Sequence, residues 1–502
     1  MKIKFLSFIL SISFLLTSCN TSINNNLDEE IKSMSLPVGN KNNFQWGVAM
    51  AGYQSEGYDN TSIWYYWDIS GKTKHRNLRA VDFYNRYKED LDLAKSIGIN
   101  AFRFSIEWSR IEPRKGFFDT SAIEYYRNLI MEIKKRGMEP LVTLVHFNYP
   151  QWLLEEDNRL KGIENPVFIN YFLRYVDKVV QEYGSEVKYW ITFNEPNIWV
   201  PGAYLLGQTP PGKKNPISMI RAGWNLIKAH CKAYDLIHRL DNDAMVSSNV
   251  YYIISNPFAP SFPVPSESNY SKLFPSVLQE SNMNNTDWFM ESINSGKVYV
   301  NRNIFLSDDN INIQSKNDLI SLEEELKNEN VNQQGDSQVS WLKRFDYVSF
   351  DYYYRFRSIK DVLNLFNFWD LEIYPPGLYD AIMYYHRKYN KPIIIAENGF
   401  GLKDLQPRKD GWTREAHLVE HVKQVKKAIS SGANVLGYYY WSLTDNYEWG
   451  SFEPRFGLYS VNALTDPELK RIPTKAVDAY RDIINNNGVT EQIQIKYGYK
   501  GK

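Results

Sequence analysis

Short apolar segments alternate with longer amphipathic segments along most of the chain. The short segments are rich in β-branched and aromatic residues, and polar residues bound each of them, which is typical of buried strands. Eight such segments predict eight strands, at residues 44–50, 100–106, 140–147, 187–193, 244–250, 347–353, 391–397 and 434–440.

The intervening segments have the period of an amphipathic helix. Clear examples are residues 82–98, 122–137 and 414–432. The first carries an apolar stripe along one face, at Phe83, Tyr87, Leu91 and Ala94. All three end in glycine, as helices often do. Strands and helices in this alternation predict an α/β fold, a closed parallel (β/α)8 TIM barrel, with an open doubly wound sheet as the alternative.

One interval breaks this rhythm. Residues 251–346 separate the fifth and sixth strands and contain stretches rich in proline, serine and asparagine. A loop of this length rarely lacks structure of its own, so we expect an insertion with short helices, one of them at 320–329. Loops that follow barrel strands lie at the face where substrates bind, and this insertion is therefore expected to shape the substrate entrance.

The N-terminus has the pattern of a bacterial lipoprotein signal. Lys2 and Lys4 precede an apolar run over 5–16, and Leu16-Thr17-Ser18-Cys19 follows it. The run is short for a membrane span. We expect cleavage before Cys19 and acylation of its thiol, with an uncleaved anchor or an ordinary signal peptide as alternatives.

The expected domain order follows from this pattern. It is a signal peptide at 1–18, a flexible polar tether at 19–42, the barrel at 43–488 with its insertion, and a C-terminal tail at 489–502. The barrel is then expected outside the cytoplasmic membrane, held to it through the N-terminal lipid.

Composition narrows the function classes. The 502 residues include 58 acidic and 58 basic side chains, so the formal charge of zero argues against a nucleic-acid partner. Aromatic residues reach 15%, which suits sugar binding as well as a bulky core. Cysteine occurs only at 19 and 231, which excludes a disulfide framework in the mature body. Cys231 is expected to be a buried apolar residue.

Two glutamates stand where barrel enzymes place their chemistry, at the carboxyl ends of strands. Glu195 follows the fourth strand and Glu397 ends the seventh. Paired carboxyl groups hydrolyse glycosides because the leaving oxygen needs a proton while the anomeric carbon needs a nucleophile or an activated water. A lone glutamate at a strand end is more often an ion-pair partner, so position alone does not decide between these roles.

Five motifs carry a specific resemblance. WGVAMAGYQSEG, FRFSIEWSRI, TFNEP, AENG and YWSLTDNYEW occur in this order. Together they resemble glycoside hydrolase family 1, the β-glucosidase and β-galactosidase family, from Phe44 to about residue 485. The C-terminal half is closest to the archaeal-type branch of that family.

The resemblance implies roles at matching positions. Glu195 would be the general acid/base and Glu397 the nucleophile that forms a covalent glycosyl-enzyme. Arg103 and Tyr353 would support the nucleophile. Substrate contacts are implied at Gln54, His146, Asn194, Tyr353, Trp441, Glu448 and Trp449. No cofactor and no metal ligand is implied.

Position 448 and three departures from the family pattern bear on specificity. Members acting on 6-phosphoglycosides replace the acid found here as Glu448, so a non-phosphorylated sugar is favoured. Asp351 stands where the family usually has asparagine and adds a carboxyl group near the nucleophile. Phe147 replaces a usual tryptophan, and Ala396 replaces threonine or serine; these two are expected to alter packing only.

Three hypotheses remain. The first is a retaining exo-β-glycosidase acting on β-glucosides or β-galactosides by double displacement. The second is a transglycosylase that passes the sugar to a glycolipid or sugar acceptor, which would suit a membrane-anchored chain. The third is a sugar-binding lipoprotein without turnover.

Overall fold

Eight parallel strands close into a barrel in the computed structural model, which describes residues 44–255, 288–295, 343–356, 369 and 371–501. Around the ring the order is β1-β11-β9-β7-β5-β4-β3-β2. The strands are β1 (Gln45–Ala49), β2 (Ala101–Ser105), β3 (Glu139–Val145), β4 (Tyr189–Asn194), β5 (Met245–Tyr251), β7 (Val348–Asp351), β9 (Ile393–Gly399) and β11 (Val435–Trp441). The (β/α)8 prediction and all eight predicted strands are confirmed.

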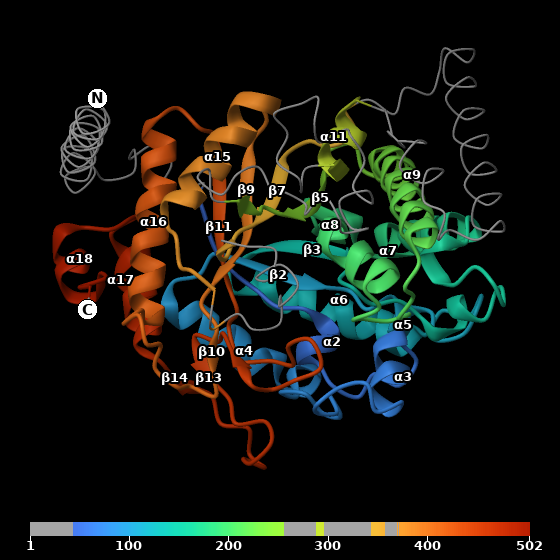
Figure 1. Ribbon diagram of the computed structural model, residues 1–502, viewed down its shortest axis with the longest axis horizontal. Helices are drawn as coiled ribbons and strands as arrows, with labels where there is room; N and C mark the ends of the chain where they lie inside the picture. The colour runs from blue at the N-terminus through green and yellow to red at the C-terminus, as the bar shows by residue number, and fades with distance from the viewer. Residues whose placement is uncertain (1–43, 256–287, 296–342, 357–368, 370, 502) are drawn as a thin grey trace, which may run out of the picture.

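Helices surround this barrel (Figure 1). The long ones are α4 (Phe83–Ile97), α6 (Thr120–Lys135), α7 (Val167–Tyr183), α9 (Pro216–Leu240), α15 (Pro376–Tyr389), α16 (Arg414–Ser430) and α17 (Lys475–Asn485). The glycines that were predicted to end α4, α6 and α16 lie just beyond them with φ of 96°, 71° and 97°. These left-handed conformations are favourable only without a Cβ atom.

Shorter elements decorate the barrel ends. The short helices are α2 (Gly52–Ser55), α3 (Ile63–Ile69), α5 (Trp108–Ile111), α8 (Pro196–Val200), α11 (Trp288–Ser295) and α18 (Glu491–Tyr497). Three two-stranded ribbons pair β6 (Ile254–Ser255) with β8 (Arg355–Phe356), β10 (Leu402–Lys403) with β12 (Pro454–Arg455), and β13 (Tyr459–Ser460) with β14 (Ile472–Pro473). Helix α18 lies in the expected C-terminal tail and packs against α16 and α17.

Alternation along each strand divides the core into two layers. Phe102 and Val142 join the large cluster between strands and helices, whereas Ala101 and Leu141 belong to a second cluster inside the barrel. Successive side chains of a strand point to opposite faces. Arg103 therefore shares the interior face with Ala101, which brings a charged side chain into the barrel at its carboxyl end.

Several expectations lie outside the described residues. They are the signal peptide and tether with Cys19, and the predicted helix at 320–329. Within the described part of the chain, no helix combines the length and apolarity that crossing a membrane requires. Cys231 lies in α9 and is buried, as expected.

Candidate active site

The two predicted glutamates meet at the carboxyl end of the barrel. Glu195 follows β4 directly, and Glu397 lies inside β9, which runs two residues further than predicted. Their side chains are 5% and 4% exposed. One carboxylate oxygen of each lies within 4.8 Å of the other. So close an approach of the two oxygens fits the retaining glycosidases, whose carboxyl groups stand about 5–5.5 Å apart, better than the inverting ones, at about 6.5–9.5 Å.

Arg103 is the cation of this site, and its guanidinium is buried. Nη1 donates to Glu397 Oε1 at 2.6 Å and to the Ala396 carbonyl at 3.2 Å. Nη2 donates to Asn194 Oδ1 at 2.6 Å, and Nε donates to Thr143 Oγ1 at 3.1 Å. Side chains from β2, β3, β4 and β9 are thereby joined through one group, which fixes Glu397 in place.

The two glutamates have different electrostatic surroundings. Burial raises the pKa of Glu397, but Arg103 and a 2.7 Å hydrogen bond from the Tyr353 hydroxyl oppose that rise and favour its ionised form. Burial and the charge of Glu397 raise the pKa of Glu195 well above its usual value. Glu397 is therefore the better carboxylate, and Glu195 the better proton donor.

A third glutamate, Glu448, faces the pocket from the loop after β11. Trp441 Nε1 donates to Glu448 Oε1 at 2.7 Å, and Gln54 Nε2 donates to Oε2 at 3.0 Å. Burial raises the pKa of Glu448 to about 7. The ring of Trp441 stacks on His146 with centroids 5.7 Å apart. An indole face beside paired acceptors suits a sugar ring with several hydroxyl groups.

Asn194 is held by its oxygen. Arg103 and Asn249 both donate to Asn194 Oδ1, the latter at 2.8 Å, and Asn194 Nδ2 lies 3.4 Å from His146 Nε2. Burial keeps the pKa of His146 well below its usual value, so its ring is neutral. The amide NH2 of Asn194 is thus oriented for donation beside the two glutamates.

Part of the pocket lining is apolar or aromatic. It includes Ile198, Trp199, Tyr251, Phe356 and Leu371. The sequence did not single out these residues. Ile198 and Trp199 follow TFNEP directly on α8, which was the one available signal, whereas Leu371 stands in no recognisable pattern.

The three departures from the family pattern have visible surroundings. Phe147 packs on Trp449 at 4.8 Å between ring centroids and on Trp199 at 5.9 Å. Ala396 is buried and its carbonyl accepts from Arg103. Asp351 is fully buried, accepts a hydrogen bond from Asn249, and places Oδ1 3.9 Å from Arg103 Nη1.

Backbone conformation at the site is unusual. Glu195, Phe147 and Trp449 have φ of 40°, 58° and 50°. Side chains rarely adopt this left-handed region, which costs on the order of 1–3 kcal/mol at each position. All three residues line the pocket. The packing around them therefore stabilises a backbone conformation that these residue types do not favour by themselves.

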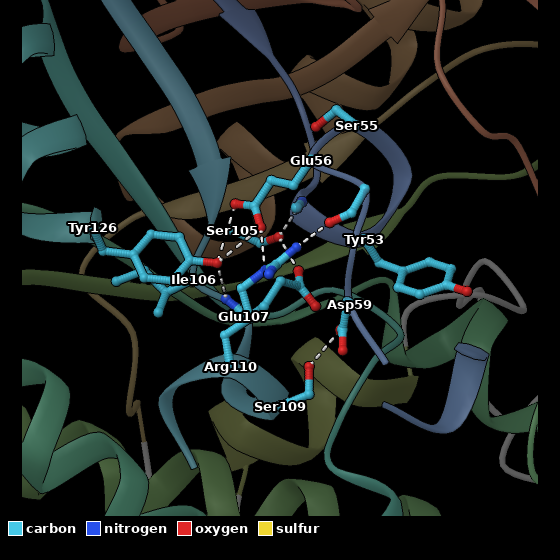
Figure 2. Close-up of polar contacts among 12 residues, drawn as sticks. Tyr53, Ser55, Glu56, Asp59, Ser105, Ile106, Glu107, Ser109, Arg110 and Tyr126 are labelled. Carbon is cyan, nitrogen blue, oxygen red and sulfur yellow. Dashed lines mark hydrogen bonds and ion pairs between the residues drawn. The ribbon is translucent and has the colours of Figure 1, made fainter. Parts of the chain in front are cut away.

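A buried polar cluster lies between the carboxyl end of β2 and α2 (Figure 2). Arg110 Nε donates to Glu56 Oε2 at 2.7 Å, and the Tyr126 hydroxyl donates to both Glu56 oxygens at 3.1 Å. Ser105 Oγ donates to Glu107 at 2.7 Å and accepts from the Gly52 N–H at 2.7 Å. This support cluster joins β2 to α2, the helix that carries Gln54.

Among the described residues, one trio of acidic side chains has the spacing of metal ligands: Glu195, Asp351 and Glu397. Arg103 already lies against two of them, so charge compensation there comes from the chain itself.

Comparisons with known proteins agree with this geometry. The sequence profile of glycosyl hydrolase family 1 matches residues 39–489. A β-galactosidase of Pyrococcus woesei is 28% identical, covering 90% of this chain and 98% of its own. A 6-phospho-β-galactosidase of Staphylococcus epidermidis is 30% identical, covering 89% and 98%. The structure of a β-glucosidase from Thermotoga maritima in complex with castanospermine superposes with a TM-score of 0.72 at 25% identity, covering 91% and 100%.

The support cluster predicts a pH-dependent stability. Burial raises the pKa of Glu56 from 4.5 to about 7, so its contribution is fully present below pH 4.5 and is lost as the pH rises through about 7. Between pH 5 and 8 we expect the wild type to lose about 1–3 kcal/mol more stability than Glu56→Gln. Thermal unfolding of both proteins measures this. The exposed Glu89→Gln should behave as the wild type, and equal losses in all three would contradict the prediction.

Proposed function

The chain belongs to glycosyl hydrolase family 1, and we propose that it releases non-phosphorylated glucose or galactose from β-glycosides through a covalent intermediate on Glu397. As a family member it is an O-glycosyl hydrolase of the retaining type. The observation that carries the assignment of roles is the asymmetry of the pair. Arg103 and Tyr353 both donate to Glu397, whereas Glu195 faces the pocket and forms no ion pair with any lysine or arginine among the described residues.

The first step forms the glycosyl-enzyme. Glu195 gives its proton to the glycosidic oxygen as that bond breaks, and a Glu397 oxygen bonds to the anomeric carbon from the opposite face. Positive charge develops on the sugar as the leaving group departs. The amide NH2 of Asn194 is placed for a hydrogen bond to the 2-hydroxyl, which strengthens in that transition state.

The second step releases the sugar. Glu195, now ionised, takes a proton from water while the water oxygen attacks the anomeric carbon and the bond to Glu397 breaks. Two inversions restore the β configuration, and Glu195 regains its proton. Arg103 and Tyr353 stabilise the carboxylate that leaves, because both donate to it directly.

Two features support a non-phosphorylated sugar. Glu448 is held by Trp441 and Gln54 on the sugar side of the pocket, where an ionised carboxylate repels a phosphate dianion. The described residues that line the pocket include no lysine or arginine that could neutralise a phosphate. The similarity to a 6-phospho-β-galactosidase covers 89% of this chain, so the support for a non-phosphorylated sugar comes from these pocket residues and not from the overall likeness.

The apolar part of the pocket lining favours an apolar aglycone. Ile198, Phe356 and Leu371 contribute to it. The same surface would also accept the apolar part of a glycolipid acceptor, which keeps transglycosylation as the second candidate. Hydrolysis and transglycosylation differ in the group that attacks the glycosyl-enzyme, which is water in the first and an acceptor hydroxyl in the second.

We further propose that the enzyme is held at the outside of the cytoplasmic membrane by a lipid on Cys19. The support is the charged and apolar sequence that precedes Cys19 and the polar stretch at 20–42 between it and the barrel. Such a tether would let the barrel reach substrates near the membrane.

The nucleophile assignment predicts a chemical rescue. Glu397→Ala should lower kcat on an aryl β-glucoside by about 10⁵-fold or more, and azide should restore turnover with an α-glycosyl azide as product. Glu195→Ala should give a β-glycosyl azide instead, because azide then attacks the intact glycosyl-enzyme.

Product analysis by mass and NMR checks this rescue, and a wild type supplied with a glycolipid distinguishes free sugar from an extended glycolipid. The control Glu139→Ala changes a glutamate at the opposite end of the barrel, on β3, and should keep turnover. Unimpaired hydrolysis by Glu397→Ala without azide would refute the mechanism.

Sugar preference gives the second test. We expect kcat/KM for an aryl β-galactoside or β-glucoside to exceed that for its 6-phosphate by at least about a hundredfold, equivalent to ~2.7 kcal/mol. Glu448→Gln should narrow that ratio, since it removes the repelling charge. Equal or faster hydrolysis of the 6-phosphate by the wild type would show that the proposed substrate class is wrong.

The proposed lipid anchor gives a third test. Full-length protein expressed in a bacterium should partition into the detergent phase of a Triton X-114 extraction, and Cys19→Ala should move it to the aqueous phase. Cys231→Ala, which changes the buried cysteine of α9, should leave partitioning unchanged. Detergent partitioning by Cys19→Ala would argue for an uncleaved apolar anchor instead.

A further inference from the structure

Asp351 introduces a third carboxyl group between the two glutamates. It ends β7, is 0% exposed, and one of its oxygens lies within 4.8 Å of both Glu195 and Glu397. The asparagine usual at this position would bring an amide. An ionisable carboxyl group therefore lies at a position that is shielded from water.

The charges around Asp351 do not balance if every acid is ionised. Facing it are Arg103 from β2, Glu195 after β4, Glu397 from β9, the Tyr353 hydroxyl beyond β7, and the neutral amide of Asn249 from β5. Three carboxylates and one guanidinium leave a net charge of about −2 in a buried volume, which is strongly unfavourable. If one of the three carboxyl groups stays protonated, the net charge falls to about −1.

Hydrogen bonding indicates where this proton lies. Asp351 Oδ2 accepts from Asn249, but Oδ1 receives no hydrogen bond from any N–H or O–H group in the described part of the chain. The carboxyl groups of Glu195 and Asp351 are within hydrogen-bonding reach of each other. Two carboxylates repel at that distance, whereas a carboxylic acid and a carboxylate form a strong hydrogen bond.

We propose that Asp351 is a positioning residue whose carboxyl group shares one proton with Glu195, and so keeps that proton in the pocket to a higher pH than Glu195 alone would. The proposal rests on the proposed acid/base role of Glu195. Burial and the charges of Glu397 and Glu195 raise the pKa of Asp351 well above its usual value. Burial and the charge of Glu397 raise the pKa of Glu195, whereas its hydrogen bond with Asp351 favours the ionised form of Glu195. The pair titrates as a unit, with one proton held over a wide pH range.

The reaction keeps the charge of this pocket constant. Before the first step the pair carries one negative charge, Glu397 another, and Arg103 one positive charge. When the proton passes to the leaving oxygen, the pair gains a negative charge while Glu397 becomes a neutral ester. The net charge is −1 in both states, and water returns the proton to the pair in the second step.

Asp351→Asn tests this because asparagine has nearly the same shape and cannot share a proton. We expect the alkaline limb of kcat/KM to move to lower pH by about one unit or more, since a carboxyl pair that shares one proton releases it at a higher pH than a single buried Glu195 does. The shift should occur with an alkyl β-glycoside, whose leaving group needs a proton. It should be absent with a dinitrophenyl β-glycoside, whose leaving group does not.

Two results would overturn the proposal: an unmoved alkaline limb with the alkyl glycoside, or an equal shift with both leaving groups, which would place the effect on Glu397. The control Asp346→Asn changes the carboxylate that precedes β7 at the opposite end of the barrel, where it contacts Tyr234 and His238, and should leave both profiles unchanged.

Infrared spectroscopy tests the shared proton without turnover. At neutral pH the wild type should show a protonated-carboxyl band that is lost or shifted in Asp351→Asn and kept in Asp346→Asn. An unchanged band would refute the shared proton. If no β-glycoside were turned over, the proposed function would fail while this spectrum still decided the state of the pair.

Discussion

The pocket depends on one buried guanidinium. Arg103 is 1% exposed and donates hydrogen bonds to Glu397, Asn194, Thr143 and the carbonyl of Ala396. Removing one partner of such a buried pair typically costs about 3–5 kcal/mol, because the other charge is left without compensation. Since these partners come from three strands other than that of Arg103, the ion pair and the closed barrel depend on each other. Closure of the barrel thus places the positive charge of Arg103 beside Glu397, the proposed nucleophile.

The three glutamates of the pocket differ in the groups that donate to them. Glu397 has both Arg103 and Tyr353, whereas Glu448 has the indole of Trp441 and the amide of Gln54. Glu195 has neither arrangement, and burial keeps its proton on. One pocket therefore holds three glutamates with different surroundings, and the proposed roles of nucleophile, acid and hydroxyl acceptor rest on those differences.

Sequence reasoning was strongest where a local rule governs local structure. Alternating apolar segments located all eight barrel strands, and glycines marked the ends of α4, α6 and α16, because these signals are short-range. The resemblance to known motifs named the side chains that the structure brings together around Glu195 and Glu397. Asn249 and Leu371 were missed, since their importance arises only from which strands and loops become neighbours. The same limit applies to Asp351. The sequence showed that an acid replaces the usual asparagine, but the contacts of this acid with Asn249 and Glu195 depend on barrel closure.

The left-handed backbone at Glu195 restricts how this enzyme can change over evolutionary time. Only glycine, asparagine and aspartate adopt such a conformation readily, so most replacements there would disturb the turn into α8 as well as remove the acid. Glycine and aspartate are each a single nucleotide change from glutamate. A descendant that abandons catalysis yet keeps a sound barrel has few routes open, and a β-branched or bulky residue at this position would signal that the loop itself had been rebuilt.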